Sequence, residues 1–143
     1  PQVGAAFSGI NGYLRREAQI PPRQLEVAIL ITSRVFDSQY EWAFHEPVAR
    51  KVGVPDKTID VIKFNQPTTG LDAEDAYLIE LGRQLWRDHR VSSETFAEGK
   101  KMFGSKKLID FVMLMGNYAA TAALLTLVDM QVREGEEMSL PLR

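Results

Sequence analysis

The stretch "PPRQLEVAILITSRVFDSQYEWAFHEPVARKVGVP", residues 21–55, decides the fold because its spacing predicts two helices in succession. Pro22 suits the first turn of a helix that runs to about Asp37, with apolar residues on nearly every face. Ser38 is placed to cap the next helix, and Gly53 is a natural residue just past its end. Neither helix shows the strict alternation expected of a half-buried strand.

The helical pattern continues through the rest of the chain. We expect a short helix over 54–64 capped by Asp56, a loop at 66–71, a long amphipathic helix capped by Asp72, a helix from Ser92 or Ser93 to Gly104, and a last helix over 105–130. We expect residues 131–143 to form an irregular tail. The sequence therefore predicts an all-α protein, a single compact domain over residues 1–143 with six or seven helices.

Composition narrows the classes of partner. A chain of 143 residues is long enough to bury a core as one domain. Its net charge of −2 and pI of about 5.7 give no electrostatic reason to expect nucleic acid or an anionic membrane. The chain has no cysteine, which excludes disulfides, thiol nucleophiles and thiolate metal sites. No secretory signal is visible, and we expect a cytoplasmic location.

Residues 111–128, "FVMLMGNYAATAALLTLV", form one long uncharged run that requires separate consideration. Asn117 lies within it, and Asp110 and Asp129 flank it, so we do not expect a membrane span. A helix that is apolar around most of its circumference is more often buried in a protein or an oligomer. We therefore expect a homo-oligomer, a dimer, trimer or hexamer, in which these apolar residues take part: Leu108, Phe111, Val112, Leu114, Met115, Leu124, Leu125 and Leu127.

Two polar residues interrupt the apolar side of the helix that follows Ser38. With Tyr40 at zero on a helical wheel, Glu41 and His45 fall at about 100° and 140°, inside the apolar arc. Residues four apart on a helix are within reach of each other. The pair is either a structural Glu–His contact or a carboxylate-oriented imidazole that acts as a general acid or base. A metal site is the weakest alternative, because the other histidine, His89, lies in a polar run.

The preceding helix adds two charged candidates, Glu26 and Arg34, in an otherwise apolar segment. Arg34 suits bidentate binding of a substrate carboxylate, or neutralisation of Glu26 or Glu41. For both residues a structural role and a functional one remain open.

Two segments resemble carboxymuconolactone decarboxylase-like proteins. They are "REAQIPPRQLEVAILITSRVFDSQYEWAFHEPVARKVGVP", residues 16–55, and "RDHRVSSETFAEGKKMFGSKKLIDFVMLMGNYAATAALL", residues 87–125. The Tyr-Glu-Trp-x-x-His piece is fairly specific, and the rest is similar in pattern. The resemblance implies the alkylhydroperoxidase D-like helical fold.

The redox motif of that wider superfamily is Glu, then Cys twelve residues on, within Cys-x-x-Cys-x-x-x-His. Glu26, Ser38, Glu41 and His45 stand at these four positions, so the glutamate and histidine are retained and both cysteines are replaced. Disulfide exchange needs thiolates, so thiol-dependent peroxidase activity is not expected. A second family segment, similar to Gly-His-Tyr, appears here as 116–118 with Asn117 in place of its histidine.

The resemblance implies a lyase that needs no organic cofactor. It would remove CO2 from a small cyclic carboxylic acid or lactone, or catalyse a related proton shift. Because the chain has no cysteine and only two histidines, we also expect no bound transition metal. The catalytic residues would be His45, which would transfer the proton, and Glu41 and Glu26, which would orient the imidazole and set its pKa. Arg34 would hold a carboxylate of the substrate. Trp42, Phe44 and Tyr118 would form apolar walls of the substrate site.

The alternative is a non-catalytic helical protein on the same fold that binds a small ligand or acts in an assembly, because a family fold does not fix activity. A small molecule bound near His45 would favour the enzyme, and a sealed, ligand-free Glu–His pair would favour the alternative.

Overall fold

The computed structural model describes residues 2–141, and every regular element in this range is a helix. The elements are α1 (Gln2–Gly12), a π-helical turn η1 (Tyr13–Glu17), α2 (Pro22–Val35), α3 (Gln39–Lys51), α4 (Asp56–Lys63), α5 (Ala73–Arg83), a second π-helical turn η2 (Gln84–Asp88) and α6 (Ser93–Leu127). The all-α prediction is confirmed. The described residues form six α-helices, or seven when α6 is divided where its backbone breaks at Gly104.

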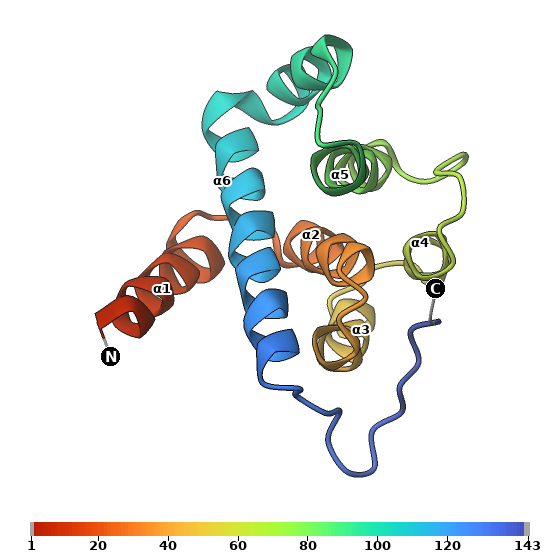
Figure 1. Ribbon diagram of the computed structural model, residues 1–143. Coiled ribbons are helices and arrows are strands. Elements are labelled where there is room, and N and C mark those ends of the chain that lie inside the picture. The colour runs from red at the N-terminus through yellow and green to blue at the C-terminus, as the bar shows by residue number, and fades with distance from the viewer. Residues whose placement is uncertain (1, 142–143) are drawn as a thin grey trace.

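Helix α2 forms the centre of the molecule, and α3, α4, α5 and α6 pack around it (Figure 1). Its residues Gln24–Arg34 are all buried, which explains why this segment is apolar on nearly every side. The buried hydroxyls of Thr32 and Ser33 donate hydrogen bonds to backbone carbonyls four residues earlier, at 2.8 and 2.9 Å. These internal bonds let α2 carry polar side chains through the core.

Most helix starts lie where the sequence predicts them. Asp72 is the N-cap of α5 and accepts a hydrogen bond from the backbone N–H of Glu74 at 3.1 Å. Ser92 is the N-cap of α6 and accepts one from Thr95 at 3.1 Å. Ser38 occupies the N-cap position of α3, although its side chain makes no capping hydrogen bond.

The prediction that Asp56 caps α4 is wrong. The N-cap is Pro55, whose backbone is extended, and Asp56 is the first helical residue. Its carboxylate forms an ion pair with Arg50 at the end of α3. A carboxylate in the first turn still favours the helix through the helix dipole, so α4 begins without a side-chain cap.

Gly104 breaks α6 as the sequence predicts. Its φ of 75° and ψ of 160° lie in a region open in practice only to glycine, so the chain changes direction there. The second part of the helix ends at Leu127, earlier than the predicted Met130, and Asp129 has a positive φ of 48°.

The long uncharged run lies in α6, which is long and apolar enough to cross a membrane by length and composition alone. Phe111, Leu114 and Met115 are fully buried, and α6 packs along α2. Packing against α2 buries part of the apolar surface of this helix, as in the core helix of a folded domain.

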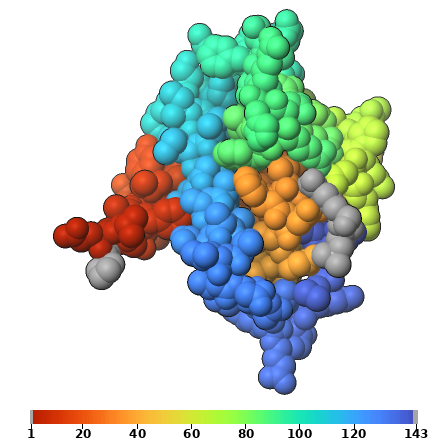
Figure 2. Space-filling model, in the orientation of Figure 1, coloured from red at the N-terminus to blue at the C-terminus, as the bar shows by residue number. Residues whose placement is uncertain are grey.

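The two ends of the described chain lie on different parts of the surface. Helix α1 projects from one side of the molecule and contacts α6 and η1 (Figures 1 and 2). The sequence pattern did not predict this helix. After α6, residues 128–141 contain no helix and run past α3 towards α4 (Figure 1). Leu140, near the end of this segment, is buried.

Candidate active site

A buried Glu–His contact joins α2 to α3. His45 Nδ1 lies 2.7 Å from Glu26 Oε2, and the two residues are 4% and 3% exposed. His45 belongs to the buried strip of α3, which also holds Glu41, Trp42 and Ala49. Because a carboxylate accepts the hydrogen from Nδ1, this contact fixes the tautomer of the neutral ring and leaves Nε2 as the second proton site.

His45 also lines a surface pocket of about 230 Å³. The pocket draws residues from α1, η1, α3, α6 and the segment after α6, and its lining consists of Asn11, Arg15, Tyr40, Glu41, Phe44, His45, Asn117, Tyr118, Thr121 and Arg133. The imidazole makes edge contacts with the rings of Phe44 and Tyr118, with centroids 5.0 and 5.2 Å away. Aromatic rings on two sides hold the imidazole at the pocket wall.

Glu41 contributes a nearly buried carboxyl group to the same pocket. It is 6% exposed, and its Oε2 has no hydrogen-bond partner among the described residues. Burial raises the pKa of Glu41 to about 7, although the positive charge of Arg15 acts in the opposite direction. Near neutral pH this carboxyl group is therefore divided between its protonated and ionised forms.

Tyr118 and Arg15 form a polar pair at another wall of the pocket. Arg15 Nη1 donates a hydrogen bond to the Tyr118 hydroxyl at 3.0 Å, which joins η1 to α6. Burial raises the pKa of Tyr118 to about 12, and the charges of Glu41 and Glu26 add to this effect while Arg15 opposes it. The phenol therefore keeps its proton across the physiological pH range.

Asn117 on α6 lines the pocket. Its Nδ2 donates to Asn11 Oδ1 at 3.2 Å, whereas its own Oδ1 is buried and has no partner among the described residues. A buried acceptor without a partner costs about 1–3 kcal/mol, which a ligand that donates a hydrogen bond would recover.

Arg133 reaches the pocket from the segment after α6. Its guanidinium lies over the rings of Phe44 and Tyr40, 5.5 and 5.9 Å from their centroids. It also donates a long hydrogen bond of 3.5 Å to the Tyr40 hydroxyl. These contacts place a positive charge above two aromatic rings that line the pocket.

The structure brings most of the predicted site residues together. His45, Glu41, Phe44 and Tyr118 line one pocket, and Glu26 supports it through its bond to His45.

Arg34 and Trp42, two of the predicted substrate-binding residues, are not among the lining residues. Arg34 is buried and forms an ion pair with Asp37. Trp42 is fully buried and donates a hydrogen bond through Nε1 to Glu46 at 2.8 Å, away from the pocket. Arg15 and Arg133 supply the positive charge that the sequence analysis assigned to Arg34. No local pattern marks them, because each meets its partner across about a hundred residues of chain.

No group of three or more histidine, cysteine, aspartate or glutamate side chains suited to a metal ion occurs in residues 2–141. His89, the second histidine, is exposed on the turn that follows η2 and does not line the pocket.

The sequence profile described as the Carboxymuconolactone decarboxylase family matches residues 1–81. This range contains Glu26, Glu41 and His45, and it includes α1, which lay outside the segments that first suggested the resemblance. No curated protein matches the chain. Because the profile covers more than half of the 143 residues, the chain belongs to the carboxymuconolactone decarboxylase family.

Proposed function

We propose that this protein is a lyase that carries out acid–base chemistry, without an organic cofactor, on a small cyclic carboxylic acid or lactone. The observation that carries the proposal is the 2.7 Å contact between His45 Nδ1 and Glu26, with the ring at the wall of a pocket. A buried carboxylate behind an imidazole orients the ring and stabilises the imidazolium when it forms. Membership of the decarboxylase family supports the class of chemistry.

The proposed reaction is loss of CO2 from a carboxylate that is conjugated to a carbonyl group. The bond between the ring carbon and the carboxylate breaks, and its electron pair moves into the conjugated carbonyl to form an enolate. Nε2 of His45 takes up a proton from water to form the imidazolium beside Glu26, and the imidazolium then gives this proton to the carbon and returns to the neutral ring. A related isomerisation would use the same nitrogen to remove a proton beside the carbonyl and return it at another carbon.

Glu41 would act in its protonated form. In the fraction of molecules whose Glu41 is protonated near pH 7, the buried carboxylic acid can donate a hydrogen bond to the enolate oxygen as negative charge develops. The phenol of Tyr118, whose pKa is about 12, is a second neutral donor at the same pocket. Both groups would stabilise an anion without carrying a charge of their own.

The pocket suits a small ring. Its volume of about 230 Å³ lies below the roughly 300–1,000 Å³ of pockets that hold drug-sized ligands. Phe44 and Tyr40 provide flat apolar surface, and Arg15 provides a positive charge. This combination favours a compact, partly apolar acid over a long flexible one.

The first experiment is a screen of unsaturated lactone carboxylic acids for CO2 release, followed by the variant His45→Gln on the best substrate. We expect His45→Gln to lower kcat by about 10²–10⁴-fold, because glutamine cannot carry the proton. Arg90→Gln, an exposed change outside the pocket lining, serves as the control and should keep full activity.

Thermal unfolding of the same variants separates chemistry from folding. If His45 has only a structural role, His45→Gln should lose about 1–3 kcal/mol of stability and leave turnover per folded molecule unchanged. That result would overturn the proposal. Ring acids that bind beside His45 without any turnover would instead support the alternative of a non-catalytic ligand-binding protein.

The cellular setting also remains a prediction. The absence of cysteine supports a cytoplasmic location and argues against thiol-dependent peroxide turnover. Cell fractionation and a thiol-coupled peroxide assay would test the two statements.

A further inference from the structure

We propose that residues 128–141 form a strap that carries Arg133 to the mouth of the pocket, where its guanidinium binds the carboxylate of an anionic ligand. This inference rests on the proposed use of the pocket and adds a residue that recognises the substrate. It assigns a role in specificity to a segment that lies far from Glu26 and His45 in the sequence and outside the part of the chain that the family profile matches.

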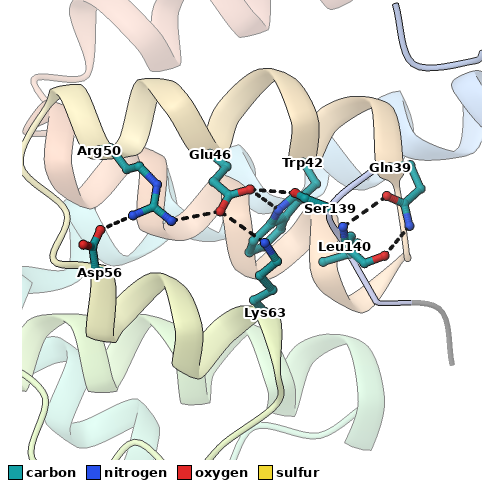
Figure 3. A network of polar contacts seen from close by, with 8 residues as sticks. All are labelled: Gln39, Trp42, Glu46, Arg50, Asp56, Lys63, Ser139 and Leu140. Carbon is teal, nitrogen blue, oxygen red and sulfur yellow. Dashed lines mark hydrogen bonds and ion pairs between the residues drawn. The ribbon is translucent and has the colours of Figure 1, made fainter. Parts of the chain in front are cut away.

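The end of the strap is anchored to the first turn of α3 (Figure 3). Gln39 Nε2 donates to the carbonyl of Leu140 at 2.6 Å, and Gln39 Oε1 accepts from the N–H of the same residue at 3.3 Å. The Leu140 side chain is 2% exposed and belongs to the core. Two hydrogen bonds and one buried side chain therefore fix this point of the strap.

A second anchor lies one residue earlier, where Ser139 Oγ donates to Glu46 Oε2 at 2.8 Å (Figure 3). Glu46 also accepts hydrogen bonds from Trp42, Arg50 and Lys63, at 2.8, 3.0 and 3.4 Å. Burial alone would raise the pKa of Glu46, but the bonds from Ser139, Arg50 and Trp42 and the charge of Lys63 lower it overall. An ionised Glu46 thus ties the strap to α3 and α4.

These anchors have a geometric consequence for the pocket. The strap leaves α6 at Val128 and is held at Ser139 and Leu140, and between these points it passes the side of α3 that carries Tyr40 and Phe44. Arg133 lies in this bridging part, with its guanidinium over both rings. The two fixed ends restrict where the arginine can go.

Arg133 forms no ion pair with a carboxylate among the described residues, and its hydrogen bond to Tyr40 is long at 3.5 Å. The carboxylate of Glu136 acts on its charge from a greater distance, so a ligand carboxylate that pairs directly with the guanidinium makes the closer contact. Arg15 is the second arginine of the lining, and Glu41 is its one acidic residue. A guanidinium binds a carboxylate through two parallel N–H donors, so the pocket favours an anion over a neutral molecule of equal size.

The test uses a matched pair of probes, benzoate and benzamide, which have similar shape and differ in charge. Isothermal titration of the wild-type protein should show tighter binding of benzoate. Arg133→Gln should weaken benzoate by about 10-fold or more and leave benzamide unchanged, because a charge-assisted hydrogen bond is lost. Arg90→Gln makes the same change in net charge away from the pocket and should match the wild type.

The anchors are tested by the double variant Gln39→Ala/Ser139→Ala. Hydrogen exchange of residues 131–140 should become faster, and benzoate affinity should fall towards that of Arg133→Gln. Faster exchange with unchanged benzoate affinity would overturn the role of the strap. Equal benzoate affinity in Arg133→Gln and wild type, or no saturable benzoate binding to the wild type, would overturn the inference as a whole.

His45→Gln separates this inference from the proposed function. It should lower kcat by about 10²–10⁴-fold and keep benzoate binding, whereas Arg133→Gln should raise KM for an acidic substrate with little change in kcat. If His45→Gln loses turnover and Arg133→Gln keeps an unchanged KM, the proposed enzymatic function stands and the role of Arg133 in substrate binding is overturned.

Discussion

Glu41 and His45 lie four residues apart on the buried strip of α3, yet they form no hydrogen bond with each other. Their spacing predicts a local pair, because side chains four residues apart on a helix face the same way. In the structure, the hydrogen-bond partner of His45 is Glu26 on α2, and Glu41 Oε2 has no partner among the described residues. The helical wheel identified both residues as buried, but only tertiary packing decides which carboxylate meets the imidazole.

The same limit applies to the charged residues of the pocket. Arg34 was a reasonable prediction because it stands in a segment whose neighbours are apolar, and the structure does bury it. Its ion pair with Asp37 is local, however, whereas Arg15 and Arg133 reach the pocket from the two ends of the chain. One sequence records local spacing and gives no measure of such long-range contacts.

Glu41 should make stability depend on pH in the direction opposite to that of an ion-paired carboxylate. Its pKa rises from 4.5 in the unfolded chain to about 7 in the fold, so between these values the folded state binds more protons. The contribution of Glu41 to the free energy of unfolding is therefore greatest at low pH. It falls by up to about 3 kcal/mol as the pH rises from the unfolded pKa of 4.5 through the folded pKa of about 7. Glu41→Gln removes this dependence.

The measurement is urea unfolding of wild type and Glu41→Gln at pH 5 and pH 8. Relative to wild type, the variant should gain about 2–3 kcal/mol between the two pH values, because glutamine has no charge to bury. Glu98→Gln, an exposed change on α6, controls for the loss of one carboxylate and should parallel the wild type. Parallel curves for wild type and Glu41→Gln would show that this carboxyl group is solvated.

At the scale of the helices, the sequence predicts elements well where a local signal stands at each end. Asp72 and Ser92 bond the backbone of the turns that they begin, and Gly104 breaks α6 where expected. The prediction fails at Asp56, because the proline before it takes the N-cap position. Helix α1 was also missed, since most of its residues are exposed and give no apolar stripe from which to predict a helix.

Gly104 offers a clean test of the break in α6. Its φ of 75° and ψ of 160° are strained for any residue with a side chain, and an added Cβ would meet no atom within 4 Å. Gly104→Ala should therefore cost about 1–3 kcal/mol through the backbone alone. Gly116→Ala, also with open space at its Cβ but inside the helix, should instead stabilise the protein by about 0.5–1 kcal/mol.

Chemical denaturation of the two alanine variants and the wild type gives the comparison. Opposite signs of the change in unfolding free energy are the expected result. If both variants are stabilised, residue 104 can adopt a helical backbone without cost, and α6 would be one continuous helix in solution.

For the whole molecule, the fold uses only part of the apolar surface that the sequence places on the last helix. Of the eight residues from which a homo-oligomer was predicted, Leu108, Phe111, Leu114 and Met115 are buried against the rest of the chain. Their burial removes half of the original argument. Other large apolar residues of α6 stay open to solvent, namely Phe96, Ile109, Met113, Leu124 and Leu127.

These open residues keep the prediction of a homo-oligomer in force. Ile109 and Leu127 are 61% and 79% exposed, and contiguous exposed apolar surface favours association with another protein surface. Light scattering at micromolar concentration should therefore give a multiple of 16.1 kDa, and Ile109→Glu should shift the mass towards one chain because a charge would be buried at the contact. Leu127→Glu tests the far end of the same helix. A wild-type species of 16.1 kDa would contradict the prediction, and the exposed face of α6 would then be free surface in solution.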